Sequence, residues 1–443
     1  MTAHRIVLHH EWVEPLWVIN GINMCRGAVA LIAGAGDPQA HGGRWSYVGC
    51  EPDELLVVEQ SDNPFDILDA AGWREGPVIG LASYDAGARV ATGLRESIWP
   101  DIILGRYPSL LIFDHIEHRI LAQGVASCAD DARRYAEQAL GWLGRAKPPA
   151  APHTPSSDFK QDMPPEQYAF AVSQVVRRIG EGELFQANIA RGWSGQLLKD
   201  RDPFDVLLGL SQDRGAAYGA FWRMDERALV SNSPELFLSY EAATRRLETR
   251  PIKGTRPRGF DHAHDCAMAE ELAASAKDRA ENLMIVDLMR NDLARVSEAG
   301  SVTVETLCEV ESHPTVHHLT SVVASQAMAN VSAAQILAAT FPPGSITGAP
   351  KHQAMKVIAS LEPPRGAWCG TLFGSGLVQE GDLIASVLIR TASFERRDEV
   401  WNWSALAGAG ITTDSDPLEE TAETEAKISA LRDALFTSGN PDS

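Results

Sequence analysis

The feature that most constrains how this chain can fold is a stretch rich in proline and serine near the end of its first third. Residues 147–157 read Lys-Pro-Pro-Ala-Ala-Pro-His-Thr-Pro-Ser-Ser. Proline lacks an amide donor and fixes the backbone angle φ, and no apolar period survives here, so neither a helix nor an inner strand is expected. The stretch therefore divides the 443 residues into an N-terminal domain (1–146), a linker (147–163) and a larger C-terminal domain (164–436).

Hydrophobic periodicity predicts a mixture of helices and strands on both sides of this linker. The N-terminal part contains short β-rich segments, such as residues 102–104 and 110–113, and ends in a helix over residues 129–144. The clearest elements of the C-terminal part are helices over 166–180, 265–292 and 418–435, and an alternating strand over 385–392. The mixture and the absence of a fixed repeat predict an α/β or α+β protein.

Composition excludes several classes of protein. The chain is 44% hydrophobic and 22% charged, which is typical of globular proteins, and its net charge of −20 argues against nucleic acid or an anionic membrane as a partner. No apolar run approaches the ~20 residues of a spanning helix, and the apolar residues 6–8 are too few for a signal peptide. The six cysteines are scattered, with no Cys-x-x-Cys pair, which fits a reducing compartment. We therefore expect a soluble, cytoplasmic enzyme.

Lys253 is a candidate nucleophile. It stands in the segment Arg-Pro-Ile-Lys-Gly-Thr, between an apolar lead-in and a Gly-Thr turn. Partial desolvation of such a lysine favours the neutral amine, which carries a free electron pair. The alternative is a solvated surface charge, which is what most lysines are.

Two pairs of acids are candidates for a metal site. Asp278 and Glu281 are three positions apart on one predicted helix, and Glu420 and Glu423 are three apart on another. Residues at this spacing share a helix face, so each helix can aim two carboxylates at one point. Such a set suits Mg²⁺, which prefers oxygen ligands; two solvated acidic faces are the alternative.

Arg390 and a group of histidines are candidates for substrate contacts. Arg390 interrupts an apolar strand, so its charge needs a partner, either a carboxylate of the substrate or a buried Asp or Glu. His313, His317 and His318 have no acidic or cysteine ligand at metal-type spacing. Packing or substrate contact is therefore expected of them rather than zinc binding.

Many separate motifs, in one order, resemble those of the chorismate-utilising enzymes, and most closely the aminodeoxychorismate synthase component I branch. The similarity runs through nearly all of residues 160–435 and more weakly through residues 45–49 and 80–87. The matching segments are 182–188, 233–235, 251–255, 275–292, 317–319, 341–351, 368–370, 389–391 and 408–411. The resemblance implies an α+β fold of two intertwined α/β subdomains, with the β-sheets packed as a sandwich and helices outside.

Two positions distinguish the reactions of this family. Relatives that add water to chorismate carry a lysine where this chain has Gln186, and anthranilate synthases carry an alanine where it has Lys253. The combination resembles the branch that replaces the C4 hydroxyl of chorismate by an amine. The resemblance implies Lys253 as a nucleophile that attacks C2, and Glu235 as the general acid that protonates the departing hydroxyl.

The resemblance also implies the other contacts of the site. Mg²⁺ would be held by Glu281 and Glu423, with Asp278 and Glu420 nearby, and would bind the ring carboxylate of chorismate. The residues implied in substrate binding are Gln186, Thr255, His318, Ser345, Thr347, Arg390, Gly408, Ala409, Gly410 and Lys427. One departure concerns a tyrosine that lines the substrate site of relatives within a Gly-Tyr pair, where this chain has Phe373 and Gly374.

The source of ammonia is expected to be a separate protein. A glutaminase needs a nucleophilic cysteine in a glycine-flanked elbow beside a histidine, and none of the six cysteines has that setting. We therefore expect a separate glutaminase subunit. The alternatives are an anthranilate-forming enzyme and a weakened subunit that only activates a glutaminase; the presence of Glu235, Lys253 and all four acids argues against the second.

Overall fold

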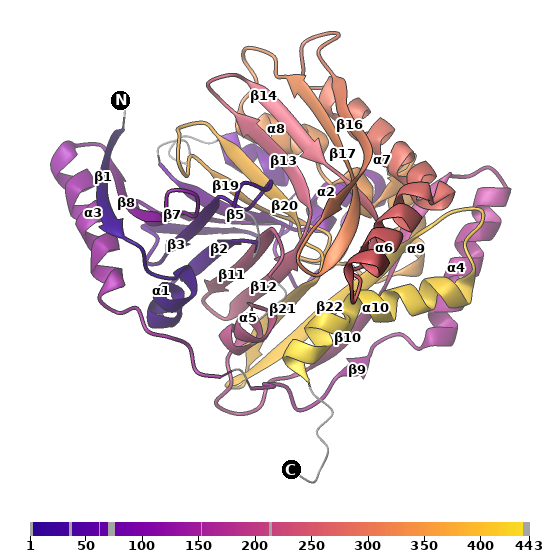
Figure 1. The fold of residues 1–443 in the computed structure, drawn as a ribbon, viewed down its shortest axis with the longest axis horizontal. Helices are drawn as coiled ribbons and strands as arrows, with labels where there is room; N and C mark the ends of the chain where they lie inside the picture. The colour runs from indigo at the N-terminus through magenta and orange to yellow at the C-terminus, as the bar shows by residue number, and fades with distance from the viewer. Residues whose placement is uncertain are drawn as a thin grey trace.

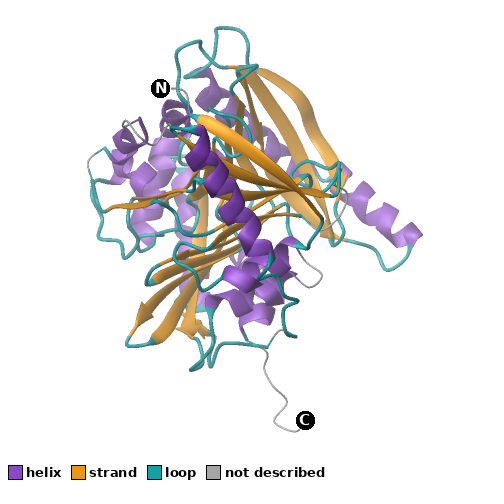
Figure 2. Ribbon diagram, turned by 90° about the vertical axis from the view of Figure 1, so that its left-hand side faces the viewer, coloured by secondary structure: helices purple, strands orange, loops and turns teal. Residues whose placement is uncertain are grey.

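Two antiparallel β-sheets form the centre of the molecule (Figure 1). The computed structural model describes residues 3–34, 38–61, 63–69, 76–151, 153–211 and 215–436. Within these ranges one sheet has twelve strands and the other has ten. Helices lie around the outside of the strands in both ribbon views (Figures 1 and 2). None of the described helices has the length and hydropathy that a membrane crossing requires.

The larger sheet contains strands from both sides of residues 147–163. Its order is β1 (His4–Glu11), β8 (Arg119–Ala126), β7 (Ser109–Asp114), β3 (Trp45–Gly49), β2 (Val29–Ala33), β11 (Tyr218–Met224), β12 (Arg227–Ser233), β21 (Thr391–Arg397), β22 (Val400–Ile411), β10 (Gln186–Gln196) and β18 (Gly348–Ala349). The short strand β9 (Lys160–Gln161) pairs with β10. The N-terminal and C-terminal strands meet where Leu31 of β2 pairs with Ala220 of β11.

The smaller sheet is shared in the same way. Its order is β15 (Ile252–Pro257), β17 (Val316–Gln326), β14 (Arg246–Arg250), β13 (Leu236–Glu241), β20 (Leu383–Val387), β19 (Thr371–Ser375), β5 (Val78–Ala82), β6 (Ile102–Arg106) and β4 (Glu54–Val58), with β16 (Thr303–Ser312) on β17. Gly80 of β5 pairs with Phe373 of β19, so this sheet too joins the two parts of the chain.

The sheets pack as a sandwich, as expected. Ile79, Leu81 and Ile103 of the smaller sheet share one buried cluster with Leu110 and Trp222 of the larger sheet. This cluster is the inner layer, because its members come from the facing sides of both sheets. Alternating side chains supply it, as is usual for strands with two different faces.

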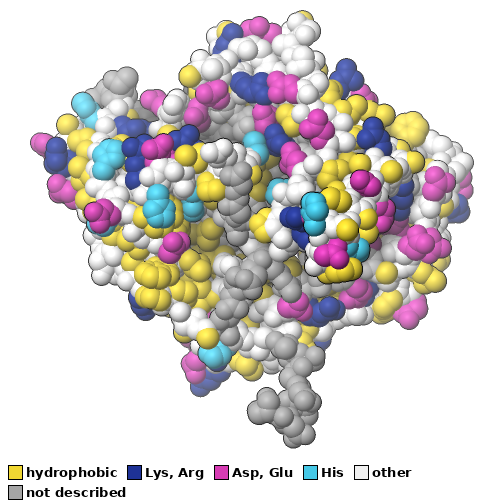
Figure 3. All heavy atoms as spheres, in the orientation of Figure 1, with side chains coloured by type: hydrophobic (Ala, Val, Ile, Leu, Met, Phe, Trp, Pro, Cys, Tyr) yellow, Lys and Arg dark blue, Asp and Glu magenta, His cyan; other side chains and the backbone are white. Residues whose placement is uncertain are grey.

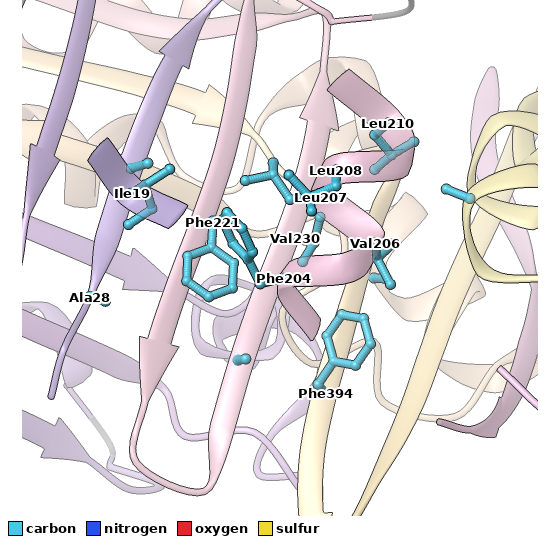
Figure 4. Close-up of a cluster of buried hydrophobic side chains, with 14 of the residues drawn as sticks. Ile19, Ala28, Phe204, Val206, Leu207, Leu208, Leu210, Phe221, Val230 and Phe394 are labelled. Atoms are coloured by element: carbon cyan, nitrogen blue, oxygen red, sulfur yellow. The ribbon is translucent and has the colours of Figure 1, made fainter. Parts of the chain in front are cut away.

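Helices cover the outer faces of the sandwich. They are α1 (Pro15–Ile22), α2 (Tyr84–Thr92), α3 (Ala129–Leu143), α4 (Pro165–Gly180), α5 (Pro203–Ser211), α6 (His262–Ala274), α7 (Ala276–Ala294), α8 (Ala333–Thr340), α9 (Lys351–Leu361) and α10 (Pro417–Leu435), with 3₁₀ turns η1 (Pro64–Asp69) and η2 (Gly344–Ile346). Figure 4 shows α5 placing Phe204 against Phe221 and Val230 of the larger sheet. The two phenyl rings meet edge to face, 5.3 Å between centroids.

Most strongly periodic segments form the predicted elements, but the helix predicted over residues 265–292 is two helices. Ser275 ends α6 and begins α7 with an extended conformation (φ −64°, ψ 107°), and its hydroxyl accepts a hydrogen bond from the amide of Asp278. A serine that caps a helix in this way competes with helix continuation. Asp278 and Glu281 therefore lie in the first two turns of α7.

The strand predicted over residues 385–392 is also interrupted. β20 ends at Val387 in the smaller sheet and β21 begins at Thr391 in the larger one. Arg390, with a positive φ of 50°, lies in the connection between them. The chain changes sheets here, which hydrophobic alternation alone does not reveal.

The proline-rich stretch lies against the larger sheet. The amide of Ser156 donates to the carbonyl of Leu435 at 2.9 Å, and Gln161 pairs with Trp193 of β10. Both sheets continue across this stretch in space, so the segments before and after it share their cores.

Candidate active site

A cleft of about 760 Å³ opens between the end of the larger sheet and the β15–β17 edge of the smaller one, with α7 and α10 beside it. The predicted residues that line it are Glu235, Lys253, Thr255, Asp278, Glu281, His318, Ser345, Arg390, Gly408, Gly410, Glu420, Glu423 and Lys427. Charged side chains of both signs are interspersed over the face seen in Figure 3.

Three predicted residues do not line this cleft directly. Thr347 is fully buried, and its hydroxyl donates to the carbonyls of Pro343 and Gly344. Ala409 packs into a hydrophobic cluster on the far side of β22. Gln186 is buried just behind the cleft wall that Gly410 forms.

Lys253 is carried into the cleft by β15. Gly254 follows it with φ 85°, and a Cβ at this glycine would lie 2.9 Å from the Cβ of Asp278, so only glycine permits the close approach to α7. A Cβ at Gly410 would lie 3.2 Å from Nζ of Lys253 and would also meet the amide of Gln186. The amine of Lys253 and the amide of Gln186 therefore both lie against the face of Gly410 that has no side chain.

Glu235 lies in the turn between β12 and β13 and is only 5% exposed. Burial raises the pKa of Glu235 to about 7, although a hydrogen bond from Ser345, the charge of Lys253 and the amide of Ile252 each offset part of the effect. A carboxyl group with a pKa near neutrality can hold a proton and release it, as a general acid must. Glu235 is therefore equipped for proton transfer.

His318 faces the cleft as a neutral ring. It pairs with Thr255 across β17 and β15, and its Nδ1 has no partner among the described residues. Burial, together with the positive charge of Arg390, lowers the pKa of His318 to about 3. Its neighbour His317 instead bonds to Asp265 and Ser312, outside the cleft.

Arg390 meets no carboxylate among the described residues. Burial lowers its pKa, and no nearby acid counteracts that effect. Its backbone carbonyl accepts a hydrogen bond from the amide of Asn232, which fixes the strained connection. Of the two partners considered for this arginine, a buried acid is absent from the described part of the chain, so its guanidinium is available to a carboxylate that enters the cleft.

The four acids differ in the basic side chains with which they pair. Glu420 accepts a hydrogen bond from Ser415 and pairs with Lys277 at 3.4 Å, and Asp278 pairs with Arg256 at 3.3 Å. Glu281 has no such pairing with any residue that the structure describes. Burial raises its pKa, and the charges of Lys253 and Lys277 offset part of this rise. Glu423 pairs with Lys427 at 2.6 Å, and this lysine outweighs burial and lowers its pKa.

The donor set fits Mg²⁺. Glu281 and Glu423 are close enough for the charge of one to raise the pKa of the other carboxyl, and Glu420 adds to the same effect. A cation between them would relieve this repulsion, and Mg²⁺ takes one or two protein carboxylates and completes its shell with water and substrate oxygens. Glu281 and Glu423 are the two that would hold it.

Two amide oxygens in the site have no partner among the described residues. They belong to Gln186 and Asn188, which point to the same face of β10 because they are two positions apart. A Cβ at Gly408 would lie 2.6 Å from Oδ1 of Asn188. Two buried acceptors without donors provide a place for a small N–H donor.

Arg365 is a buried arginine that was not predicted from the sequence, and it connects several segments that line the cleft. Arg365 donates to the carbonyl of Asn188 at 2.6 Å and to that of Ile346 at 3.1 Å, and its guanidinium lies over the ring of Trp368. Besides the carboxylate of Glu362, its acceptors are these two backbone carbonyls, which have no signature in a sequence. Only the Arg-Gly pair ahead of Trp368 could have drawn attention to it.

Trp368, not Phe373, is the aromatic residue of the cleft wall. The indole of Trp368 lines the cleft beside Cys369, and its Nε1 has no partner among the described residues. Phe373 points away and packs over Gly80 in the core outside the smaller sheet. Neither Phe373 nor Gly374 lines the cleft.

Comparison with known proteins agrees with this fold. The family model for chorismate binding enzymes matches residues 40–433. Aminodeoxychorismate synthase component 1 of Escherichia coli (strain K12) is 38% identical over 395 residues, which are 86% of this chain and 82% of that protein. Anthranilate synthase component 1 of Saccharolobus solfataricus is 31% identical over 98% of this chain and 99% of its own length.

A solved structure gives the same result. The crystal structure of anthranilate synthase component I from Streptococcus pneumoniae TIGR4 superimposes with a TM-score of 0.74 at 28% identity, covering 88% of this chain and 92% of that one. This chain belongs to the family of chorismate binding enzymes. It is similar both to aminodeoxychorismate synthases and to anthranilate synthases.

Proposed function

We propose that this chain is an aminodeoxychorismate synthase component I, which converts chorismate and ammonia to 4-amino-4-deoxychorismate and water for p-aminobenzoate and folate biosynthesis. The observation that carries the proposal is the position of Lys253, whose amine lies beside the amide of Gln186 above Gly410. An amine here can attack the substrate ring, and a glutamine does not activate water as a lysine would.

The proposed reaction has two displacements. Glu235 protonates the C4 hydroxyl, which leaves as water while the amine of Lys253 forms a bond to C2 and loses a proton. Ammonia then attacks C4 and the ring double bonds shift back, while the nitrogen of Lys253 takes up a proton and leaves C2 as the neutral amine with its electron pair. The new ammonium group at C4 loses one proton, which balances the proton that Lys253 regains. The pKa of Glu235, about 7, supports its role as the proton donor in the first step.

Substrate binding is assigned to the remaining cleft residues. Arg390 would bind one carboxylate of chorismate, since its guanidinium has no acid partner among the described residues. Mg²⁺, held by Glu281 and Glu423, would neutralise the ring carboxylate. The unpaired amide oxygens of Gln186 and Asn188 would accept N–H groups of the incoming ammonia.

Ammonia would come from glutamine through a separate glutaminase subunit, and the enzyme would work in the cytoplasm. The support is that the E. coli relative is named as component 1 of its synthase, which implies a second component. Glutamine should therefore sustain turnover only when a glutaminase subunit is added.

Product analysis tests the proposal. The purified chain is incubated with chorismate, Mg²⁺ and an ammonium salt, and the products are separated by chromatography. The expected product is 4-amino-4-deoxychorismate. Anthranilate as the main product would assign the chain instead to the reaction of its S. solfataricus relative, and no conversion at all would favour a subunit that only activates a glutaminase.

A further inference from the structure

Two cysteines outside the cleft are neighbours in space although they are far apart in the sequence. Cys25 follows α1 and Cys50 follows β3, and their sulfur atoms and a carboxylate oxygen of Glu51 all lie within 4.8 Å of one another. Within the described ranges, no other group of three such side chains is this close. The scattered spacing of the cysteines in the sequence concealed this pair.

The backbone segments that carry the two thiols run side by side. The amide of Glu51 donates to the carbonyl of Arg26 at 2.8 Å. The next residues of the two segments, Gly27 and Pro52, are also in close contact. A Cβ at Gly27 would lie only 2.5 Å from Cδ of Pro52. The two segments are therefore in direct contact next to Cys25 and Cys50, and this contact holds the two sulfur atoms within 4.8 Å of each other.

The two thiols differ in environment. Cys25 is partly exposed, and the positively charged Nη1 of Arg145 lies 3.6 Å from its sulfur. Cys50 is 1% exposed and shares a hydrogen bond with Cys25, and burial raises the pKa of its thiol. Cys25 is thus the thiol that a reagent reaches first, and Cys50 is the one placed to follow.

We propose that Cys25 and Cys50 form a reversible oxidation site that a small-molecule disulfide, such as oxidised glutathione, converts to an intramolecular disulfide. The thiolate of Cys25 attacks one sulfur of the reagent, forms a mixed disulfide and releases one small thiolate. Cys50 then loses its proton, attacks the sulfur of Cys25 and expels the second small thiolate. The protein is oxidised by two electrons, and the reagent is reduced to two thiols.

A thiophilic metal ion would use the same three side chains, but the charge of Arg145 beside Cys25 disfavours a cation there. The disulfide would close a loop that contains β2 and β3. Closing such a loop restricts the unfolded chain, so oxidation should raise the melting temperature.

Mass spectrometry tests the site. The reduced protein is treated with oxidised glutathione, and its intact mass and non-reducing peptide map are recorded. The expected result is the loss of two hydrogens, with one linked pair of peptides containing Cys25 and Cys50. In the C25S variant the linked pair should be absent, and Cys50 should stay free because the reagent does not reach it.

Cys128 provides a matched control. It is exposed, but its sulfur lies 3.3 Å from Oδ2 of Asp131, an acid in place of the arginine. Cys128 should therefore react several-fold more slowly than Cys25, and R145Q should slow Cys25 without changing Cys128.

Three results would overturn the proposal. One is a stable glutathione adduct on Cys25 with Cys50 still free, and another is equal reactivity of Cys25 and Cys128. The third is a stoichiometric zinc ion that is lost in C25S and protects the thiols of the wild type. None of these measurements depends on chorismate chemistry, so their failure would leave the proposed function untouched.

Discussion

The carboxylate of Glu362 forms a bidentate ion pair with the guanidinium of Arg365, with Oε2 2.8 Å from Nε and Oε1 3.0 Å from Nη2. Both side chains are almost completely buried. The same carboxylate accepts a hydrogen bond from the amide of Ala190 at 2.7 Å, so the pair joins β10 to the loops that carry Ile346 and Trp368.

Removing one partner of this pair should destabilise the protein strongly. E362Q leaves the charge of Arg365 buried and uncompensated, and we expect a loss of about 3 to 5 kcal/mol in the free energy of unfolding, measured with urea. E399Q is the control, because Glu399 forms an exposed pair with Arg396 and should change stability by less than about 1 kcal/mol. Equal stability of the two variants would contradict the structural role of Glu362.

The hydrogen bond from Ser345 to Glu235 predicts a shift of the pH profile. S345A removes a bond that stabilises the carboxylate, so the pKa of Glu235, about 7, should rise. A general acid works in its protonated form, so the variant should lose less activity than the wild type as pH rises. The ratio of variant to wild-type kcat/KM should therefore increase between about pH 6 and 9.

Taking this ratio cancels the titration of ammonia itself. The control is S360A on α9, whose hydroxyl bonds only within its own helix. Its ratio to wild type should stay flat with pH. A flat ratio for S345A as well would show that Ser345 does not set the protonation of Glu235.

Glu281 and Glu423 should each be needed for Mg²⁺ binding. E281Q or E423Q removes one anionic oxygen ligand, so the affinity measured by calorimetric titration should fall by at least about tenfold. E419Q on the exposed side of α10 is the control and should bind as the wild type does. If both variants keep wild-type affinity, these acids belong to a solvated face instead.

Gly410 should tolerate no side chain. A Cβ there would meet the amide of Gln186 and lie 3.2 Å from Nζ of Lys253. Displacing these groups by about 1 Å should lower the rate of chorismate consumption by about tenfold to hundredfold in G410A. G180A is the control, because nothing lies within 4 Å of a Cβ at that helical glycine. Full activity of G410A would show that the position of Gly410 does not matter for the groups that react.

The sequence predicted those parts of the fold that depend on local periodicity. The helices α3, α4 and α10 begin and end within about two residues of the predicted positions, because their amphipathic pattern extends over several turns. Two predictions were wrong: the single helix over residues 265–292, which is interrupted at Ser275, and the single strand over residues 385–392, which is interrupted at Arg390. Each of these residues interrupts a regular element through one backbone conformation that the surrounding pattern does not encode.

The site was predictable where motifs carry it and obscure where it depends on distant partners. Lys253, Glu235 and the acids of α7 and α10 lie at one cleft, as the resemblance implied. Arg365 was missed because its contacts to the cleft walls are to backbone carbonyls, and the Cys25–Cys50 pair because the fold alone brings the two thiols together. Ala409 was implied through its backbone, as part of the segment 408–411, and its side chain faces the other side of the strand.

Variants of Lys253 examine the nucleophile itself. K253A removes the amine, so formation of 4-amino-4-deoxychorismate should slow by orders of magnitude. K253R should not rescue it, because a guanidinium stays protonated and cannot attack carbon. In the emptied site ammonia can reach C2 directly, so some anthranilate-type product is expected from K253A. A K253A variant with near-normal rate and product would make Lys253 an ordinary charge.

The most direct test of the covalent role of Lys253 is the mass of the wild-type protein after incubation with chorismate and Mg²⁺ in the absence of ammonia. Without ammonia the second displacement cannot occur, so the adduct at C2 should accumulate. We expect a protein heavier by chorismate less one water, with the added mass on the peptide that contains Lys253 and none on K253A. An unmodified Lys253 under conditions in which added ammonia restores full turnover would contradict it.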